Sequence, residues 1–268
     1  MGRYLSFNGN YFNFPIRADF RKRKEYFSDY VLSGGRDKAI YGVIRITPEL
    51  TAEYDVNGLR FLEYVLGTVS DDGATISVES TLPTADYKVT VDSDNMSIHN
   101  AKVNTWELRI EEGNPVRAEF SVIGNTIGTE AATQYNVCFS SLPLLPNQCT
   151  LFIDGVANTI WNRISVRINN NLEPLFKGST IPQEIRERGL EVTGAIRANE
   201  YSEFLSEGSI DLVLGTIGTL VMANVKLTEV PARVRGFDLP ETEISFQAFP
   251  VCTDNDAIIA YLGDTITW

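Results

Sequence analysis

The sequence predicts a mainly β protein made of two tandem modules, each a β-sandwich or barrel with a short flanking α-helix. Polar and apolar residues alternate in many segments, which is the pattern of strands with one buried face. The pattern (Val/Ile)-x-Gly-(Ala/Val)-Ile-Arg occurs twice, in residues 40–45 and 192–197. With 268 residues, 43% of them hydrophobic, the chain is long enough for two modules of ordinary size.

The repeat is predicted to cover two strands and the connection between them. Gly194 lies 152 positions after Gly42, and the same spacing sets residues 12–20 against residues 164–172 with their apolar positions in phase. A glycine inside a strand costs packing, so its recurrence indicates a position where another part of the protein comes close. We therefore expect two copies of equal length, each with a packing glycine in its second strand.

Each half is expected to continue with a short helix, because helical apolar spacing marks residues 56–66 and, more briefly, residues 199–206. Closing strands follow. They are residues 106–110 and 116–122 around a turn at 111–115, and residues 221–227 and 243–249. The proline-containing stretch 140–148 is the expected linker, so we predict modules at residues 1–150, linker included, and 151–268.

Charge and cysteine content narrow the class of protein. The formal net charge of −12 argues against a protein whose main task is to grip nucleic-acid phosphates. Cys138, Cys149 and Cys252 have neither metal-binding spacing nor the density of a disulfide framework, which favours synthesis in a reducing compartment. No apolar run is long enough for a signal peptide or a membrane span, so neither is expected.

No catalytic or metal-binding constellation is evident. The only histidine, His99, lies in no nucleophile motif, which favours an exposed or hydrogen-bonded turn histidine over a catalytic one. Asp92, Asp94 and Asn95 begin like a calcium loop, but Ser97 stands where that loop needs glycine. We expect no enzymatic activity, no cofactor and no metal.

The most basic stretch is R21-K-R-K24, which is followed by Tyr26 and Phe27. Basic residues beside aromatics can bind single-stranded nucleic acid. The counterpart in the second half, residues 176–188, is mixed in charge, so a protein contact surface is the favoured interpretation.

The series I164-S-V-R-I-N-N-N-L-E-P-L-F-K-G, I185-R-E-R-G-L-E-V-T-G-A-I-R197, short helix and closing strands resembles the tail tube proteins of long-tailed bacteriophages and related archaeal viruses. The first half, with G42-V-I-R-I-T-P-E-L-T-A-E-Y54 and G58-L-R-F-L-E-Y-V-L-G67, is similar to the larger, duplicated members of that family. The resemblance implies rings whose inner sheets join into one β-barrel around a channel, stacked into a tube through which the genome passes.

The resemblance also implies roles for parts of this chain. The long connections at residues 21–38 and 173–189 would contact the neighbouring ring. The ring-stacking candidates are Arg21, Lys22, Arg23, Lys24, Tyr26, Phe27, Lys177, Glu184, Arg186, Glu187 and Arg188. The channel-lining candidates are Arg17, Tyr41, Arg167, Asn169 and Thr193.

Family rings hold six modules, so three two-module chains would make a homotrimeric, pseudo-hexameric ring, with six copies as the alternative. Implied partners are further copies of the chain and the tape measure, tail tip and terminator proteins, with no membrane. The implied location is the virion tail, assembled in the host cytoplasm. An acidic tube would let DNA pass during genome ejection without binding it specifically.

Two other functions remain open. A tail-tip, hub or tail-completion protein would use the same modules in a single ring that does not polymerise. A two-domain β-sandwich that binds carbohydrate or a host surface would need exposed aromatic clusters, whereas Trp106, Trp161 and Trp268 are scattered.

Overall fold

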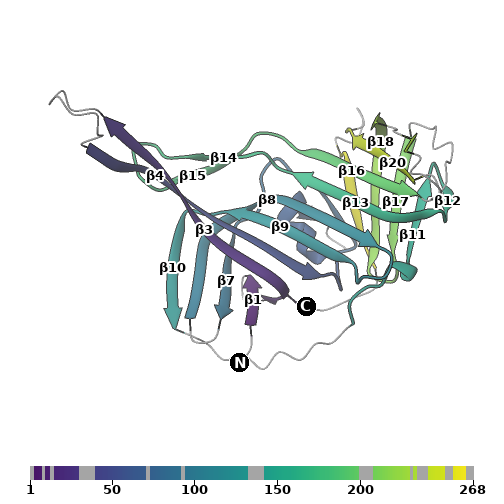
Figure 1. Ribbon diagram of the computed structural model, residues 1–268, viewed down its shortest axis with the longest axis horizontal. Coiled ribbons are helices and arrows are strands. Elements are labelled where there is room, and N and C mark those ends of the chain that lie inside the picture. Colours follow the sequence, from purple (N-terminus) through teal and green to yellow (C-terminus); the bar gives the residue numbers. More distant parts are fainter. Residues whose placement is uncertain are drawn as a thin grey trace.

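The computed structural model describes residues 3–7, 10–12, 15–29, 40–70, 73–91, 94–131, 142–198, 208–229, 232–233, 241–250 and 256–263. They form a mainly β, sandwich-like protein of antiparallel strands, as predicted (Figure 1). The helix expected at residues 56–66 is confirmed as the turn η1 (Arg60–Leu62) and the helix α1 (Glu63–Leu66). The second expected helix, at residues 199–206, lies outside the described residues.

The first half contains β1 (Arg3–Phe7), β2 (Asn10–Tyr11), β3 (Pro15–Asp29), β4 (Ile40–Asp55), β5 (Gly67–Val69), β6 (Thr75–Val78), β7 (Ala85–Val91), β8 (Asp94–Glu111), β9 (Arg117–Ile123) and β10 (Thr126–Ala131). The turn η2 (Pro146–Gln148) follows. The second half contains β11 (Cys149–Ile153), β12 (Val156–Asn158), β13 (Trp161–Asn169), β14 (Leu172–Leu175), β15 (Glu184–Glu187), β16 (Glu191–Ala198), β17 (Gly208–Leu214), β18 (Gly218–Glu229), β19 (Ala232–Arg233), β20 (Glu241–Ala248) and β21 (Ile258–Leu262).

One antiparallel sheet runs through both halves in the order β3–β4–β9–β8–β13–β16–β20–β18, and β19 continues β18 along β20. We call it the long sheet. The two halves meet at its centre, where β8 pairs with β13 from Glu111 opposite Arg163 to Thr105 opposite Asn169. The predicted closing hairpins are both present, with Trp106 opposite Phe120 and Leu227 opposite Phe246.

Each half also has an outer sheet that shares a long strand with the long sheet. The first part of β8 pairs with β7 and β10, and the first part of β18 pairs with β17 and β21. Both long strands change sheets at an asparagine of positive φ, Asn100 (48°) and Asn224 (49°). Asparagine tolerates this left-handed conformation better than most residues, which suits it to a strand bend.

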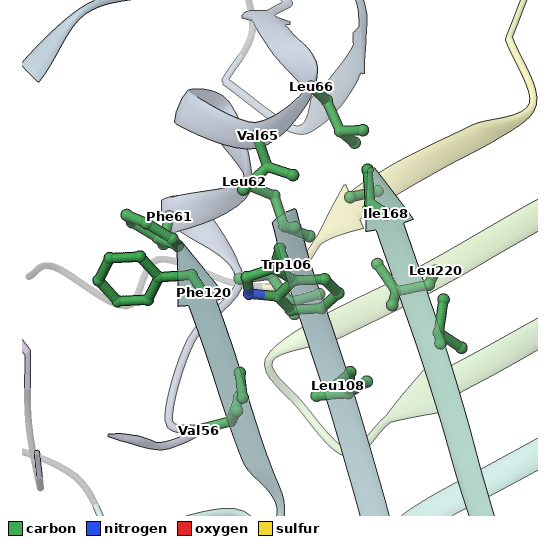
Figure 2. Close-up of a cluster of buried hydrophobic side chains, with 14 of the residues drawn as sticks. Val56, Phe61, Leu62, Val65, Leu66, Trp106, Leu108, Phe120, Ile168 and Leu220 are labelled. Carbon is green, nitrogen blue, oxygen red and sulfur yellow. The ribbon is translucent and has the colours of Figure 1, made fainter. Parts of the chain in front are cut away.

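The hydrophobic core is continuous across the two halves. Trp106 on β8 is 1% exposed and lies in one cluster with Ile168 on β13 and Leu220 on β18, below the helix residues Leu62 and Val65 (Figure 2). Asn170, 5% exposed, donates hydrogen bonds to the carbonyl oxygens of Val65 (2.9 Å) and Val103 (3.0 Å). The β8–β13 junction is therefore closed by apolar packing and by satisfied polar groups.

A hairpin from the first half also extends the outer sheet of the second. β6 pairs with β5 and with β21, where Ile76 lies opposite Ala260. The Leu262 N–H donates to the Ala74 carbonyl oxygen at 2.7 Å. The described part of the linker is hydrogen-bonded to the first half, because the Leu144 N–H donates to the Val56 carbonyl oxygen and the Val116 N–H donates to the Leu144 carbonyl oxygen, both at 2.8 Å. The module boundary near residue 150 remains a prediction.

Strand pairing confirms that the topology is duplicated. β13 has a register shift between Trp161 and Arg163 opposite β16, and β3 has the same shift between Pro15 and Arg17 opposite β4. The outer-sheet strands repeat this agreement, with shifts at Ala85/Tyr87 of β7 and Gly208/Ile210 of β17. Matching these irregularities makes β3 the counterpart of β13, β4 of β16, and β8 of β18 with β19.

The expected constant spacing of 152 residues is wrong. The matched shifts set Trp161 against Pro15, 146 positions apart, and Ala198 against Tyr54, 144 positions apart. Gly194 therefore corresponds to Leu50 in the long sheet, whereas Gly42 pairs with Phe27 further out along β3. The error has a physical reason: the two alignments differ by an even number of residues, which leaves a period-two pattern in phase.

The two long connections are β-hairpin arms. In the first arm, the end of β3 pairs with the start of β4, with Tyr26 opposite Val43. In the second arm, β14 pairs with β15, with Leu172 opposite Glu187. Both arms extend to the same side of the molecule, away from the second half (Figure 1). The paired ends Pro15 and Tyr54 are 39 positions apart, whereas Trp161 and Ala198 are 37 apart, so the expected equal length of the copies is also wrong.

Candidate assembly surface

The long sheet has a polar face opposite its core face. On β9, Ala118, Phe120 and Val122 are fully buried, so the alternating residues between them point to the other side. The polar face combines acids and bases on neighbouring strands. Its charged residues include Arg17, Asp19, Glu49, Glu53, Asp55, Glu107, Arg109, Glu111, Arg117, Glu119, Arg163, Arg167, Glu191, Arg197 and Glu243.

Ion pairs within the chain neutralise several of these arginines. The Arg109 Nε lies 2.7 Å from Glu107 Oε1, and the hydrogen bond to Glu107 raises the pKa of Arg109. The Arg117 Nε lies 3.4 Å from Asp55 Oδ1, and Arg17 pairs with Asp19. The face is therefore of mixed charge, and its arginines have nearby carboxylates. Arg17–Asp19 is exposed and the other two pairs are only partly buried, so each contributes little stability.

Four of the five channel-lining candidates lie on this polar face. Arg167 lies opposite Glu107 of β8 on one side and opposite Thr193 of β16 on the other. Asn169 follows on β13, and Arg17 lies on β3 with its side chain 66% exposed. Tyr41 pairs with Ser28 in the first arm, and the strand position that corresponds to Thr193 is Glu49.

Both ends of the long sheet are open within the described residues. β3 is hydrogen-bonded there to β4 alone, and the end of β18 together with β19 is hydrogen-bonded to β20 alone. Such edges offer unpaired N–H and C=O groups to another chain. The basic stretch lies along the first edge, because Arg21, Lys22, Arg23 and Lys24 are exposed residues of β3. The expected connection at residues 21–38 is thus a strand as far as Asp29.

The second arm packs against the first half. The Ile46 N–H donates to the Thr180 carbonyl oxygen at 2.7 Å, and the Arg45 guanidinium lies 4.9 Å from the ring centre of Phe176. The face of an aromatic ring attracts a cation that lies over it. These contacts join the tip of the second arm to β4 where β4 enters the first arm.

A partly buried ion pair fixes the base of the second arm. Glu187 Oε1 accepts hydrogen bonds from Lys102 Nζ (2.6 Å) and from the Leu82 N–H (3.0 Å). Burial alone would raise the pKa of Glu187, but the bonds from Lys102 and Leu82 outweigh it and hold the pKa below its ordinary value. Sequence reasoning placed Glu187 in a stacking loop and had no signal for this contact, because Lys102 and Leu82 belong to the other half.

The other second-arm candidates form local ion pairs. Glu184 pairs with Lys177 and with Arg186, and Arg188 pairs with Glu173. The hydrogen bond from Lys177 is the main cause of the lowered pKa of Glu184. On the first arm, Tyr26 and Phe27 belong to β3. Lys177, Arg186 and Arg188 are exposed, and the second-arm positions are of mixed charge, which suits a protein contact surface.

His99 has a geometry that resembles a hydrolase triad. Its Nε2 lies 2.9 Å from Ser97 Oγ, and its Nδ1 lies 3.2 Å from Asp86 Oδ2. Ser97 is only 2% exposed, and Gly128 of β10 lies directly opposite it. Asp86 also accepts a hydrogen bond from the Asn100 N–H at 2.8 Å. The group therefore ties β7 to the bend of β8 and leaves the serine covered.

No group of three or more His, Cys, Asp or Glu residues in the described ranges could hold a metal ion. Asp92 and the other two cysteines lie outside those ranges. Cys149 is buried, and burial raises the pKa of its thiol to about 12. No helix in the described part of the chain is long and apolar enough to cross a membrane.

A family model described as phage tail tube protein matches residues 20–248, which cover most of the chain and both halves. No curated protein matches the sequence significantly.

Proposed function

Because this chain belongs to the phage tail tube protein family, we propose that it assembles into closed rings, and that the rings stack into the hollow tube through which the genome leaves the virion. The family is structural, and its members are components of the virion tail. Ring closure, stacking and genome passage are the proposal.

The continuity of the long sheet across the two halves is the observation that carries this proposal. β8 and β13 join two modules edge to edge while the polar face remains uninterrupted. The same sheet ends in open edges at β3 and β18–β19. Joining those edges between copies would close the sheet into a barrel, which removes every exposed edge.

Three copies are the proposed number. Each chain supplies two modules, so three chains would give a ring with pseudo-sixfold symmetry. Six copies would suit a ring in which only one module of each chain faces the channel.

We assign the polar face to the channel, with Arg17, Arg167, Asn169 and Thr193 among its residues. DNA phosphates bind proteins mainly through free cationic side chains. The carboxylates beside Arg17, Arg109 and Arg117 reduce that attraction, so a wall of paired charges would let DNA slide. This mechanism replaces simple repulsion by an acidic wall.

The two arms would contact the neighbouring ring together. The contacts Arg45–Phe176 and Ile46–Thr180 hold them side by side, so each chain would present one double arm. The proposed partners beyond further copies of the chain are the tape measure, tail tip and terminator proteins, with assembly in the host cytoplasm.

Electron microscopy of the purified protein across a concentration series tests this function. We expect regular hollow tubes with a constant outer diameter. Single rings that never stack would favour a tail-tip or completion protein. Monomers at every concentration, with binding to glycans, would contradict both and support a surface-binding protein.

A further inference from the structure

The two open edges of the long sheet match the two strands of the β8–β13 junction. β18 with β19 corresponds to β8, and β3 corresponds to β13. β8 and β18 bend at Asn100 and Asn224, and from there Ala101 and Val225 take equivalent places opposite β7 and β17. The partner strands agree, since Leu108 lies opposite Ala118 and Ala232 lies opposite Thr242. One junction is thus formed inside the chain, and both sides of a second one are present but apart.

From this correspondence we propose the register of the contact between copies, which rests on the proposed ring: β18–β19 of one copy pairs antiparallel with β3 of the next, with Glu229 opposite Arg23 and Arg233 opposite Asp19. Within the chain, Thr105 lies opposite Asn169 and Arg109 lies opposite Ser165. Glu229 and Arg233 occupy the positions of Thr105 and Arg109. Arg23 and Asp19 occupy those of Asn169 and Ser165.

The charges support this register. Both predicted pairs join an acid to a base, although the pairs they correspond to inside the chain contain no such combination. Directly opposed residues of opposite charge stabilise antiparallel pairing, and like charges destabilise it. Arg23 is exposed and has no ion pair among the described residues, so its charge is available to a neighbour. Asp19 already pairs with Arg17, which makes Arg23–Glu229 the clearer test.

The residues that this register brings together on the core face are also compatible. Ala232 would lie opposite Phe20, at the place where Leu108 lies opposite Val166 inside the chain. Phe20 is only partly buried within one copy, although it packs against the main core. A neighbouring strand would cover it and continue the apolar layer from one copy into the next.

A charge exchange tests the register. Arg23→Glu and Glu229→Arg should each raise the critical concentration for tube assembly about tenfold, because each sets like charges against one another. The double variant R23E/E229R should return assembly to within about twofold of the unchanged protein. Light scattering measures the critical concentration, and electron microscopy shows the product.

Lys24→Glu is the matched control. It makes the same change of charge one residue further along β3, where alternation points the side chain to the other face. The double variant K24E/E229R should assemble no better than E229R alone. Circular dichroism and thermal unfolding of each variant at low concentration establish that it remains folded.

The outcomes separate the two proposals. If the unchanged protein forms tubes but R23E/E229R assembles as poorly as its parents, the register is wrong and the tube function stands. Equal rescue by K24E would also contradict the register, because it would show a general charge effect. If the unchanged protein forms no tubes, the proposed function itself fails.

Discussion

Gly194 shows how one residue can limit the packing of the long sheet. A Cβ atom at this position would lie 2.3 Å from Phe246 Cζ and 2.5 Å from the Ser165 carbonyl oxygen. Both distances are shorter than any normal contact, and the carbonyl belongs to the paired strand. The expected packing role of this glycine is therefore confirmed, although its supposed twin at Gly42 lies in an arm.

Gly194→Ala should destabilise the protein by about 1–3 kcal/mol, because β13 and Phe246 must move to make room. Chemical denaturation of the unassembled protein measures this. Gly58→Ala is the control, since no atom lies within 4 Å of its added Cβ. Equal stability of the two variants would contradict the packing role.

Glu187→Gln should destabilise the protein by about 1–3 kcal/mol at neutral pH, because it leaves the partly buried ammonium of Lys102 without its counter-ion. The pKa of Glu187 is lowered in the folded state, so the ion pair contributes fully above the unfolded pKa of about 4.3. The contribution is lost as the pH falls through the lower folded pKa.

The difference in unfolding free energy between the unchanged protein and E187Q should therefore shrink between pH 7 and pH 3. Denaturant titrations at both pH values measure it. Glu184→Gln is a suitable control, because Glu184 belongs to the same arm but its partners are exposed. A difference that stays constant with pH would contradict the assignment to this carboxylate.

At the level of elements, the second arm has two separable parts. Its base is held by Glu187, and its tip contacts β4 through Phe176 and Thr180. Removing the tip alone should leave the long sheet intact, because β14 and β15 can still pair. A longer deletion, of residues 178–187, would also remove Glu187 and so confuse stacking with folding.

Replacing residues 176–183 by Asn-Gly joins Leu175 to Glu184 through a two-residue hairpin turn. We expect a folded protein that still forms rings but no longer forms long tubes. The tip of the second arm is missing, so only the first arm can reach the neighbouring ring. Electron microscopy distinguishes rings from tubes. Phe176→Leu serves as the control that removes the cation–π contact and keeps the arm. Normal tubes from the shortened protein would contradict the proposed stacking role.

The elements also show what a sequence pattern can predict. Strand alternation correctly predicted the fold class, the two closing hairpins and the duplicated topology, because burial of one face imposes period two. Alternation could not fix which residues of the two halves correspond. Shifting one half by an even number of residues keeps its apolar positions in phase, so the match of residues 40–45 with 192–197 was misleading. Alternation also missed Asn170 and Lys102, because their partners lie across the junction and leave no local trace.

At the scale of the whole molecule, the number of copies per ring is open to a direct test. It uses Arg23→Glu and Glu229→Arg, the two single variants that weaken the contact between copies. When mixed, each can pair favourably only with the other. A closed ring of alternating variants requires an even number of copies.

For three copies, an equal mixture should recover only in part, because every mixed ring of three keeps one like-charged contact, whereas either variant alone has three. For six copies, it should assemble about as well as the double variant. Light scattering of the mixture against both parents measures this. Recovery to the level of the double variant would contradict the proposed trimer while supporting the register.

The β5–β6 hairpin makes the two kinds of junction unequal. Inside the chain, β6 fastens the first half to β21 in addition to the β8–β13 contact. Within the described residues, the second half has no counterpart of this hairpin between β16 and β17. In a ring of three, junctions supported by this hairpin would therefore alternate with contacts between copies that lack it. Under bending or internal pressure such a tube would open at three evenly spaced lines along its length, and it would come apart into whole chains.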